Sequence, residues 1–101
     1  MAKENYKEIF KLKEMLEKAQ IPFVFKEHND DRNGYQILYP SVGEKSKCSV
    51  IEHSYSYGNE QDLLEIMGLL TDEESEYDSI VGFLSAENVF ERIKKDYENH
   101  K

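Results

Sequence analysis

The sequence predicts a two-layer α+β domain in which helices near the two ends of the chain cover one face of an antiparallel sheet. Two observations lead to this prediction. Apolar residues recur at helical spacing near both ends, and the region between them alternates apolar and polar residues in short runs separated by turn residues. The expected order is α-β-β-β-(β)-α, and 101 residues leave room for a single domain over residues 1–101.

The first helix is expected over residues 5–20. Its end is set by Pro22, because the residue before a proline is pushed away from helical backbone angles. The apolar stripe of this helix consists of Tyr6, Ile9, Phe10, Leu16 and Ala19, with Leu12 or Met15 at its margin.

A β-hairpin is expected next. Residues 23–28 are aromatic and β-branched, and residues 35–39 alternate apolar with polar side chains. The polar segment between them closes on Asn33-Gly34, a pair that tolerates turn conformations. In the second strand, one face carries Tyr35, Ile37 and Tyr39.

The middle of the chain predicts a third strand over residues 48–57, with Cys48, Val50 and Glu52 on one face. Residues 62–70 fit either a helix or a strand, and we favour a strand because a short turn would then complete a second hairpin. An acidic loop or a short helical turn follows over residues 71–78. Residues 80–84 are apolar and expected to be buried, and Gly82 indicates a close approach of the chain.

The last helix begins at Ala86, because Ser85 can cap it and Glu87 places an acid in its first turn. Its apolar stripe consists of Val89, Phe90, Ile93 and Tyr97.

Negative charge is concentrated in one region of the chain. Residues 48–91 contain eleven acids and no lysine or arginine, whereas residues 1–47 carry nine bases against eight acids. With four bases and two acids after residue 91, the three parts (−11, +1 and +2) add up to the net charge of −8. Such a region repels a phosphate backbone, so direct nucleic-acid binding is not expected.

The acidic segment and two nearby tyrosines form the candidate partner surface. Three interpretations of the acids stay open: a solvated loop, a docking surface for a basic partner protein, or an imitation of a phosphate chain. The residues assigned to this surface are Asp72, Glu73, Glu74, Glu76, Asp78, Tyr55 and Tyr57.

Catalytic chemistry finds little support in the sequence. A metal site could draw on His28, Asp30, Asp31, His53 or Cys48, but their spacing matches no compact ligand motif. A metal-dependent hydrolase would use His28, Asp30 or His53. Nucleophile and phosphate-cradling motifs are missing, because no serine stands in a G-x-S-x-G setting and every glycine is isolated. The carboxyl best placed for acid–base work is Glu65, between two apolar residues. We therefore expect no enzyme, no metal and no cofactor.

The N-terminal residues and the single cysteine indicate the cellular compartment that we expect. A single cysteine, Cys48, cannot form an internal disulfide, and the N-terminal residues form no apolar leader. No apolar run approaches the ~20 residues of a membrane span. We expect a cytoplasmic protein without membrane contact.

The C-terminal half resembles a known group. The strings YGNEQDLLEIMGLL, residues 57–70, and VGFLSAENVFERI, residues 81–93, are similar to small proteins of phages and prophages of Gram-positive bacteria, a group without an assigned activity. The resemblance covers about residues 48–97 and transfers no functional residue. It implies an accessory protein of a mobile element in the bacterial host cell.

The sequence therefore favours a non-enzymatic domain that binds another protein, with a homodimer through an edge strand as an option. Its first rival is an acidic nucleic-acid mimic that inhibits a host DNA-processing or defence enzyme. The second rival is the metal-dependent hydrolase.

Overall fold

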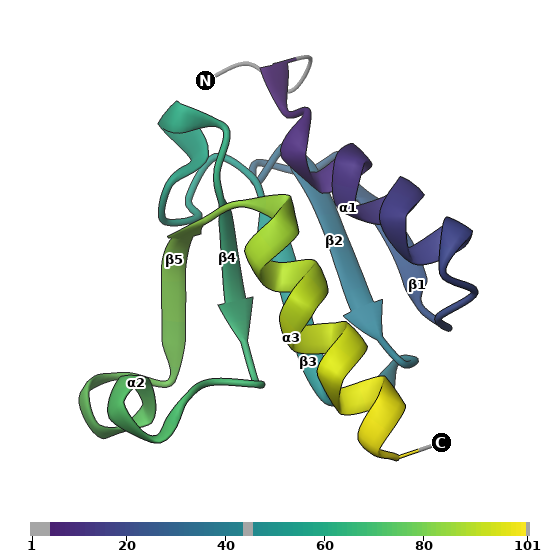
Figure 1. Ribbon diagram of the computed structural model, residues 1–101. Coiled ribbons are helices and arrows are strands. Elements are labelled where there is room, and N and C mark those ends of the chain that lie inside the picture. Colours follow the sequence, from purple (N-terminus) through teal and green to yellow (C-terminus); the bar gives the residue numbers. More distant parts are fainter. Residues whose placement is uncertain (1–4, 44–45, 101) are drawn as a thin grey trace.

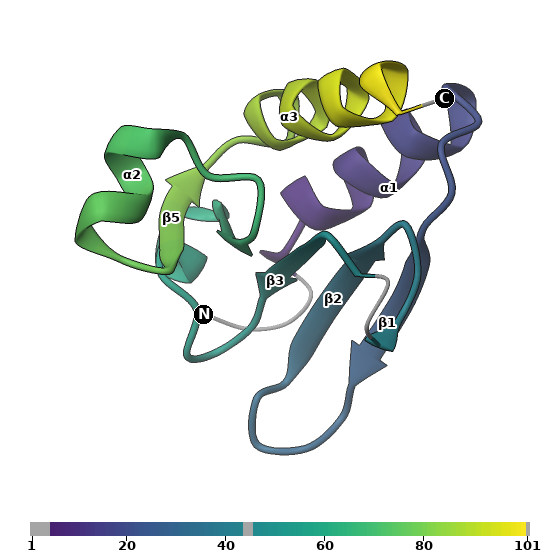
Figure 2. The ribbon, with the colours of Figure 1, turned by 90° about the horizontal axis from the view of Figure 1, so that it is seen from below.

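The computed structural model describes residues 5–43 and 46–100. The helices and strands are α1 (Glu8–Lys18), β1 (Val24–His28), β2 (Gly34–Tyr39), β3 (Cys48–Glu52), the 3₁₀ turn η3 (Asn59–Gln61), β4 (Leu64–Met67), α2 (Asp72–Tyr77), β5 (Ile80–Leu84) and α3 (Ala86–Asn99). The strands form one antiparallel sheet in the order β1-β2-β3-β4-β5. Both α1 and α3 lie on the same face of this sheet (Figures 1 and 2), which confirms the two-layer α+β prediction.

The predicted N-terminal hairpin is present. Its register runs from Val24 opposite Leu38 to His28 opposite Gly34. The turn places Asn33 at a φ of 48°, a conformation that asparagine tolerates better than most residues. Because side chains alternate across a strand, Ile37 and Tyr39 face the helices, where both are buried.

The region 48–84 differs from the prediction in two ways. The strand prediction for residues 62–70 is confirmed in the shorter β4, but β3 ends at Glu52 instead of residue 57. The chain turns there, with the Ser56 amide donating to the His53 carbonyl at 3.1 Å. Residues 80–84, expected to be buried, instead form a strand, β5, that is half-buried and leaves Phe83 58% exposed. The register of β5 with β4 shifts between Leu64 and Ile66, which interrupts the regular alternation of its side chains.

Helix α1 is shorter than predicted and turns a slightly different stripe to the core. It begins at Glu8, and its buried residues are Ile9, Leu12 and Leu16. Phe10, assigned to the apolar stripe, is instead 43% exposed. Its ring packs at the edge of the two layers, with ring centroids 5.4 Å from Phe25 and 4.6 Å from Tyr35. Leu12 takes the central place because it lies one turn from both buried neighbours.

Helix α3 begins where the sequence predicts. The Ser85 hydroxyl accepts a hydrogen bond from the Asn88 amide at 3.1 Å. Its buried face, Ala86, Val89 and Ile93, meets α1 and the sheet. The apolar core between the layers consists of Tyr6, Ile9, Leu12, Leu16, Ile21, Ile37, Tyr39, Cys48, Val50, Leu64, Ile66, Ala86, Val89 and Ile93. In the described ranges, no helix has the length and apolarity needed to cross a bilayer.

Gly82 permits the close approach that the sequence indicates. A Cβ atom at this position would lie 2.3 Å from the Cβ of Tyr57, a separation that packed side chains do not reach. The Phe83 amide donates to the Tyr57 carbonyl at 3.3 Å beside this contact. The glycine thus allows the turn after β3 to lie directly on β5.

Replacing this glycine tests the contact. Gly82→Ala should lower the free energy of unfolding by about 1–3 kcal/mol, because the added methyl group forces the two segments apart. Urea unfolding followed by circular dichroism measures the change. Gly43→Ala is the control, since no atom lies within 4 Å of its added Cβ and only backbone strain, about 1 kcal/mol, is expected. An equal loss in the two variants would contradict the steric argument.

Candidate functional site

Helix α2 carries most of the candidate surface at one end of β4 and β5 (Figure 1). Its N-terminus is closed by a capping box, in which Thr71 accepts from the Glu74 amide and the Glu74 carboxylate accepts from the Thr71 amide. Four of the five predicted acids are exposed: Asp72, Glu73, Glu76 and Asp78. Tyr77, which the sequence analysis did not assign, is 84% exposed beside them.

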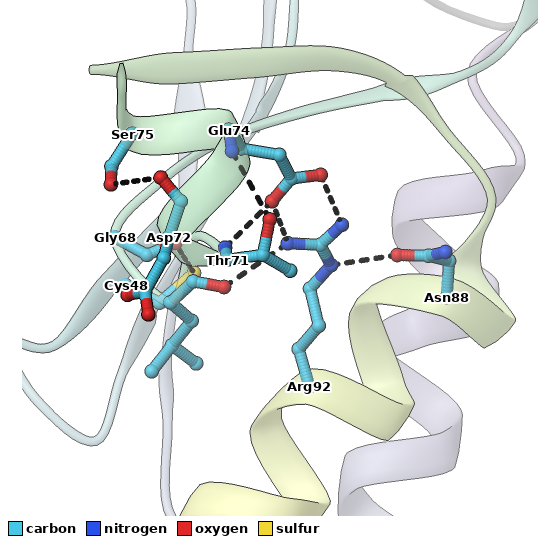
Figure 3. A network of polar contacts seen from close by, with 9 residues as sticks. Cys48, Gly68, Thr71, Asp72, Glu74, Ser75, Asn88 and Arg92 are labelled. Carbon is cyan, nitrogen blue, oxygen red and sulfur yellow. Dashed lines mark hydrogen bonds and ion pairs between the residues drawn. The ribbon is translucent and has the colours of Figure 1, made fainter. Parts of the chain in front are cut away.

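The fifth acid, Glu74, faces inward and holds α2 against α3 (Figure 3). Its two carboxylate oxygens accept from the Arg92 guanidinium at 2.8 Å each, a bidentate pair. Arg92 also donates to the Leu69 carbonyl at 3.1 Å and to the Asn88 side chain at 2.7 Å. The Arg92 hydrogen bonds, assisted by the Thr71 amide, lower the pKa of Glu74 to about 2. Glu74 therefore attaches α2 to α3 and adds little negative charge to the surface.

The two tyrosines of the candidate surface lie at the opposite end of the sheet. Tyr55 and Tyr57 belong to the turn after β3 and are 65% and 55% exposed. The Tyr57 amide donates to the buried carboxylate of Glu65 at 2.8 Å, and the Tyr55 hydroxyl reaches Asp31 at 3.5 Å. Because β4 and β5 separate this turn from α2, the structure divides the predicted surface into two surfaces (Figure 1).

The acids of residues 48–91 are not all solvated. Among contacts within the described ranges, five of the eleven bind groups in another element or turn, which the residue pattern did not reveal: Glu52, Asp62, Glu65, Glu74 and Glu87. The largest group of exposed acids that remains is the one on α2. Negative charge therefore gathers at this short helix and does not cover one continuous face.

Glu52 lies in an unusual environment that the sequence did not predict. It is fully buried, and its Oε1 accepts from the Ile9 amide at 3.3 Å. Asp62 beside it accepts from the Lys7 and Glu8 amides at 2.8 and 3.1 Å. Burial, followed by a hydrogen bond from the neutral Glu52 carboxyl to Asp62, raises the pKa of Glu52 to about 9. The one available signal was its place on the apolar face of β3.

The residues considered for metal chemistry are engaged elsewhere. The Nε2 atom of His28 pairs with Gln36 at 2.9 Å, and Asp30 binds Arg32 at 2.7 Å. His53 Nδ1 accepts from the Tyr55 amide at 3.1 Å. Burial raises the pKa of the Cys48 thiol to about 12, which suppresses the thiolate. Among residues 5–43 and 46–100, no three potential ligands gather around one point.

A shallow groove of about 1040 Å³ runs beside the Arg92 network along α3. Its lining combines bases, including Lys94 and Lys95, with acids such as Glu87 and Glu91. Charges of both signs give this groove no preference for an anion or a cation.

The comparisons with known proteins give no relative: no protein-family model, no curated protein and no solved structure matches the chain.

The buried Glu52 makes stability depend on pH. Its pKa is about 9 in the folded state against 4.5 for the ordinary side chain, so the folded state retains a proton that the unfolded state releases. Stability should therefore fall as pH rises through this window, by on the order of a few kcal/mol in total. Urea midpoints measured at about pH 5.5 and about pH 8.5 should differ for the natural protein and much less for Glu52→Gln. The exposed Glu60→Gln serves as control, and an unchanged pH slope in Glu52→Gln would contradict the assignment.

The Arg92–Glu74 pair gives a second stability prediction. Arg92→Lys should lower the free energy of unfolding by about 1–2 kcal/mol, because an ammonium group cannot reproduce the bidentate geometry. The loss should be largest above pH 4.5 and shrink as the pH falls toward 2, where Glu74 takes up its proton. Thermal unfolding at several pH values measures this, with the exposed Lys94→Ala as control. A loss of unfolding free energy no greater than that of the control would contradict a stabilising role for the Arg92–Glu74 ion pair.

Proposed function

We propose that the protein is a non-enzymatic binding protein that docks a basic partner protein through α2, as an accessory factor of a phage or another mobile element in the bacterial cytoplasm. The observation that carries this proposal is that four exposed carboxylates lie on or directly after a helix, α2, that is firmly attached to α3. Glu74 is turned inward to Arg92, while Asp72, Glu73 and Glu76 on the same helix point to solvent.

Rigidity matters because a fixed set of charges loses less entropy on binding than a flexible loop does. The capping box and the bidentate pair hold both the start and the middle of α2. The nearest exposed aromatic, Tyr77, supplies the kind of residue that often anchors an interface core. Carboxylates around a tyrosine suit a partner surface with lysine or arginine, and they repel nucleic acid.

A charge reversal on α2 tests the proposal. The triple variant Asp72→Lys, Glu73→Lys, Glu76→Lys leaves Glu74 in place, so the fold should persist. Tagged protein incubated with bacterial host lysate should retain a partner that the triple variant loses, with binding that weakens as salt rises. The control reverses Glu91 and Glu98, two exposed acids of α3 that belong to neither candidate surface. A partner retained equally by all three proteins, or no specific partner, would contradict the docking role of α2.

The nucleic-acid mimic remains the second proposal. The attachment of α2 through Glu74 and Arg92 favours it, because imitation of phosphates requires carboxylates at fixed positions. Competition separates the two. If the retained partner is a DNA-binding enzyme displaced from this protein by duplex DNA, α2 acts as a mimic; if DNA leaves the complex intact, it acts as an ordinary docking surface.

A further inference from the structure

The turn after β3 and strand β5 together form a second candidate site, far from α2. A pocket of about 150 Å³ is lined by Tyr57 and Phe83 together with the polar residues Asn59, Glu60 and Gln61. The two aromatic side chains are 55% and 58% exposed. A pocket whose lining includes two aromatic residues and one acid is of the kind that attracts a cation.

The backbone beside this pocket is conformationally strained. Phe83 adopts a φ of 60°, a conformation that side chains with a Cβ atom rarely take and that costs about 1–2 kcal/mol. Two glycines, Gly58 and Gly82, bring the segments together: an added Cβ at Gly58 would lie 3.0 Å from the Phe83 amide nitrogen. This strain holds an aromatic side chain in an exposed position, although exposure gives a phenyl group no hydrophobic benefit.

The charged side chain in the lining of the pocket is an acid, Glu60. No lysine or arginine occurs in residues 48–91, which supply the whole lining. Within the described part of the chain, the Glu60 side chain forms no ion pair or hydrogen bond. The buried carboxylate of Glu65 binds only the Tyr57 amide among the contacts found there, and no cation of those residues neutralises it. The lining therefore offers the Glu60 carboxylate to a cation of a binding partner.

We propose that this pocket binds the guanidinium group of an arginine side chain of a partner protein. A guanidinium stacks on aromatic rings, is weakly hydrated, and matches the carboxylate of Glu60 with parallel hydrogen bonds. The amide oxygens of Asn59 and Gln61 offer further acceptors. The site goes beyond the acidic helix, because it lies at the other end of β4 and β5 and recognises one side chain by shape as well as charge.

The direct test uses short peptides and nuclear magnetic resonance. The peptide acetyl-Gly-Arg-Gly-amide should shift the amide signals of residues 56–61 and of Phe83, with a dissociation constant on the order of millimolar for a single side chain. The same peptide with citrulline, a neutral isostere of arginine, should produce no comparable shifts. Equal shifts with citrulline, or shifts scattered over the molecule, would overturn the proposal.

Variants then assign the effect to the pocket. Phe83→Gly removes the ring and relieves the positive φ, so the fold should survive while binding falls below detection. Glu60→Gln should weaken binding about three- to tenfold. Tyr77→Ala, which removes an exposed aromatic side chain on α2, is the matched control and should bind as the natural protein does. Retained binding by a folded Phe83→Gly variant would overturn the proposal.

The outcome can be separated from the role proposed for α2. The triple charge reversal at Asp72, Glu73 and Glu76 should leave peptide shifts at Phe83 unchanged, because the two surfaces lie at opposite ends of the strands (Figure 1). Loss of the peptide shifts in that folded variant would show that bulk negative charge, and not the aromatic pocket, attracts the arginine.

Discussion

Carboxyl groups placed at the starts of helices hold this molecule together. The first amides of α1 are satisfied by Asp62 and Glu52, which come from the sheet side of the fold. Glu8 in α1 then accepts a hydrogen bond from the Ala86 amide at 2.9 Å, at the start of α3. Because α1 lacks a local side-chain cap, its position depends on these distant carboxyls. The sheet thus positions α1, α1 positions α3, and α3 holds α2 through Arg92.

This chain of contacts changes the meaning of the acidic region. A net charge of −8 suggests a surface property, yet several acids act inside the fold as caps and ion-pair partners. Glu52 is neutral at neutral pH because its burial favours the protonated form. Once these groups are assigned, Asp72, Glu73 and Glu76 on α2 form the largest group of exposed acids, which is why the proposed function rests on them.

The two candidate surfaces use different physics. At α2, exposed charges stand on a rigid short helix, so any attraction is long-ranged and sensitive to salt. At the turn after β3, a strained Phe83 and the glycine-mediated contact with Tyr57 form a small aromatic pocket beside Glu60. A partner that engages both ends would bind along β4 and β5, the part of the chain without a single base.

The sequence by itself determined the fold class, the hairpin, the Ser85 cap and the tight contact at Gly82. Each of these follows from local periodicity or from one residue's conformational preference. Only the tertiary structure decided the rest. Strand β5 was not predicted as a strand because its bulge interrupts the alternation of side chains. Phe10 lies outside the core because packing against the sheet sets the rotation of the helix. Likewise, whether Glu74 or Asp72 faces solvent depends on where Arg92 of another helix lies, and long-range contacts of that kind leave no local trace in the chain.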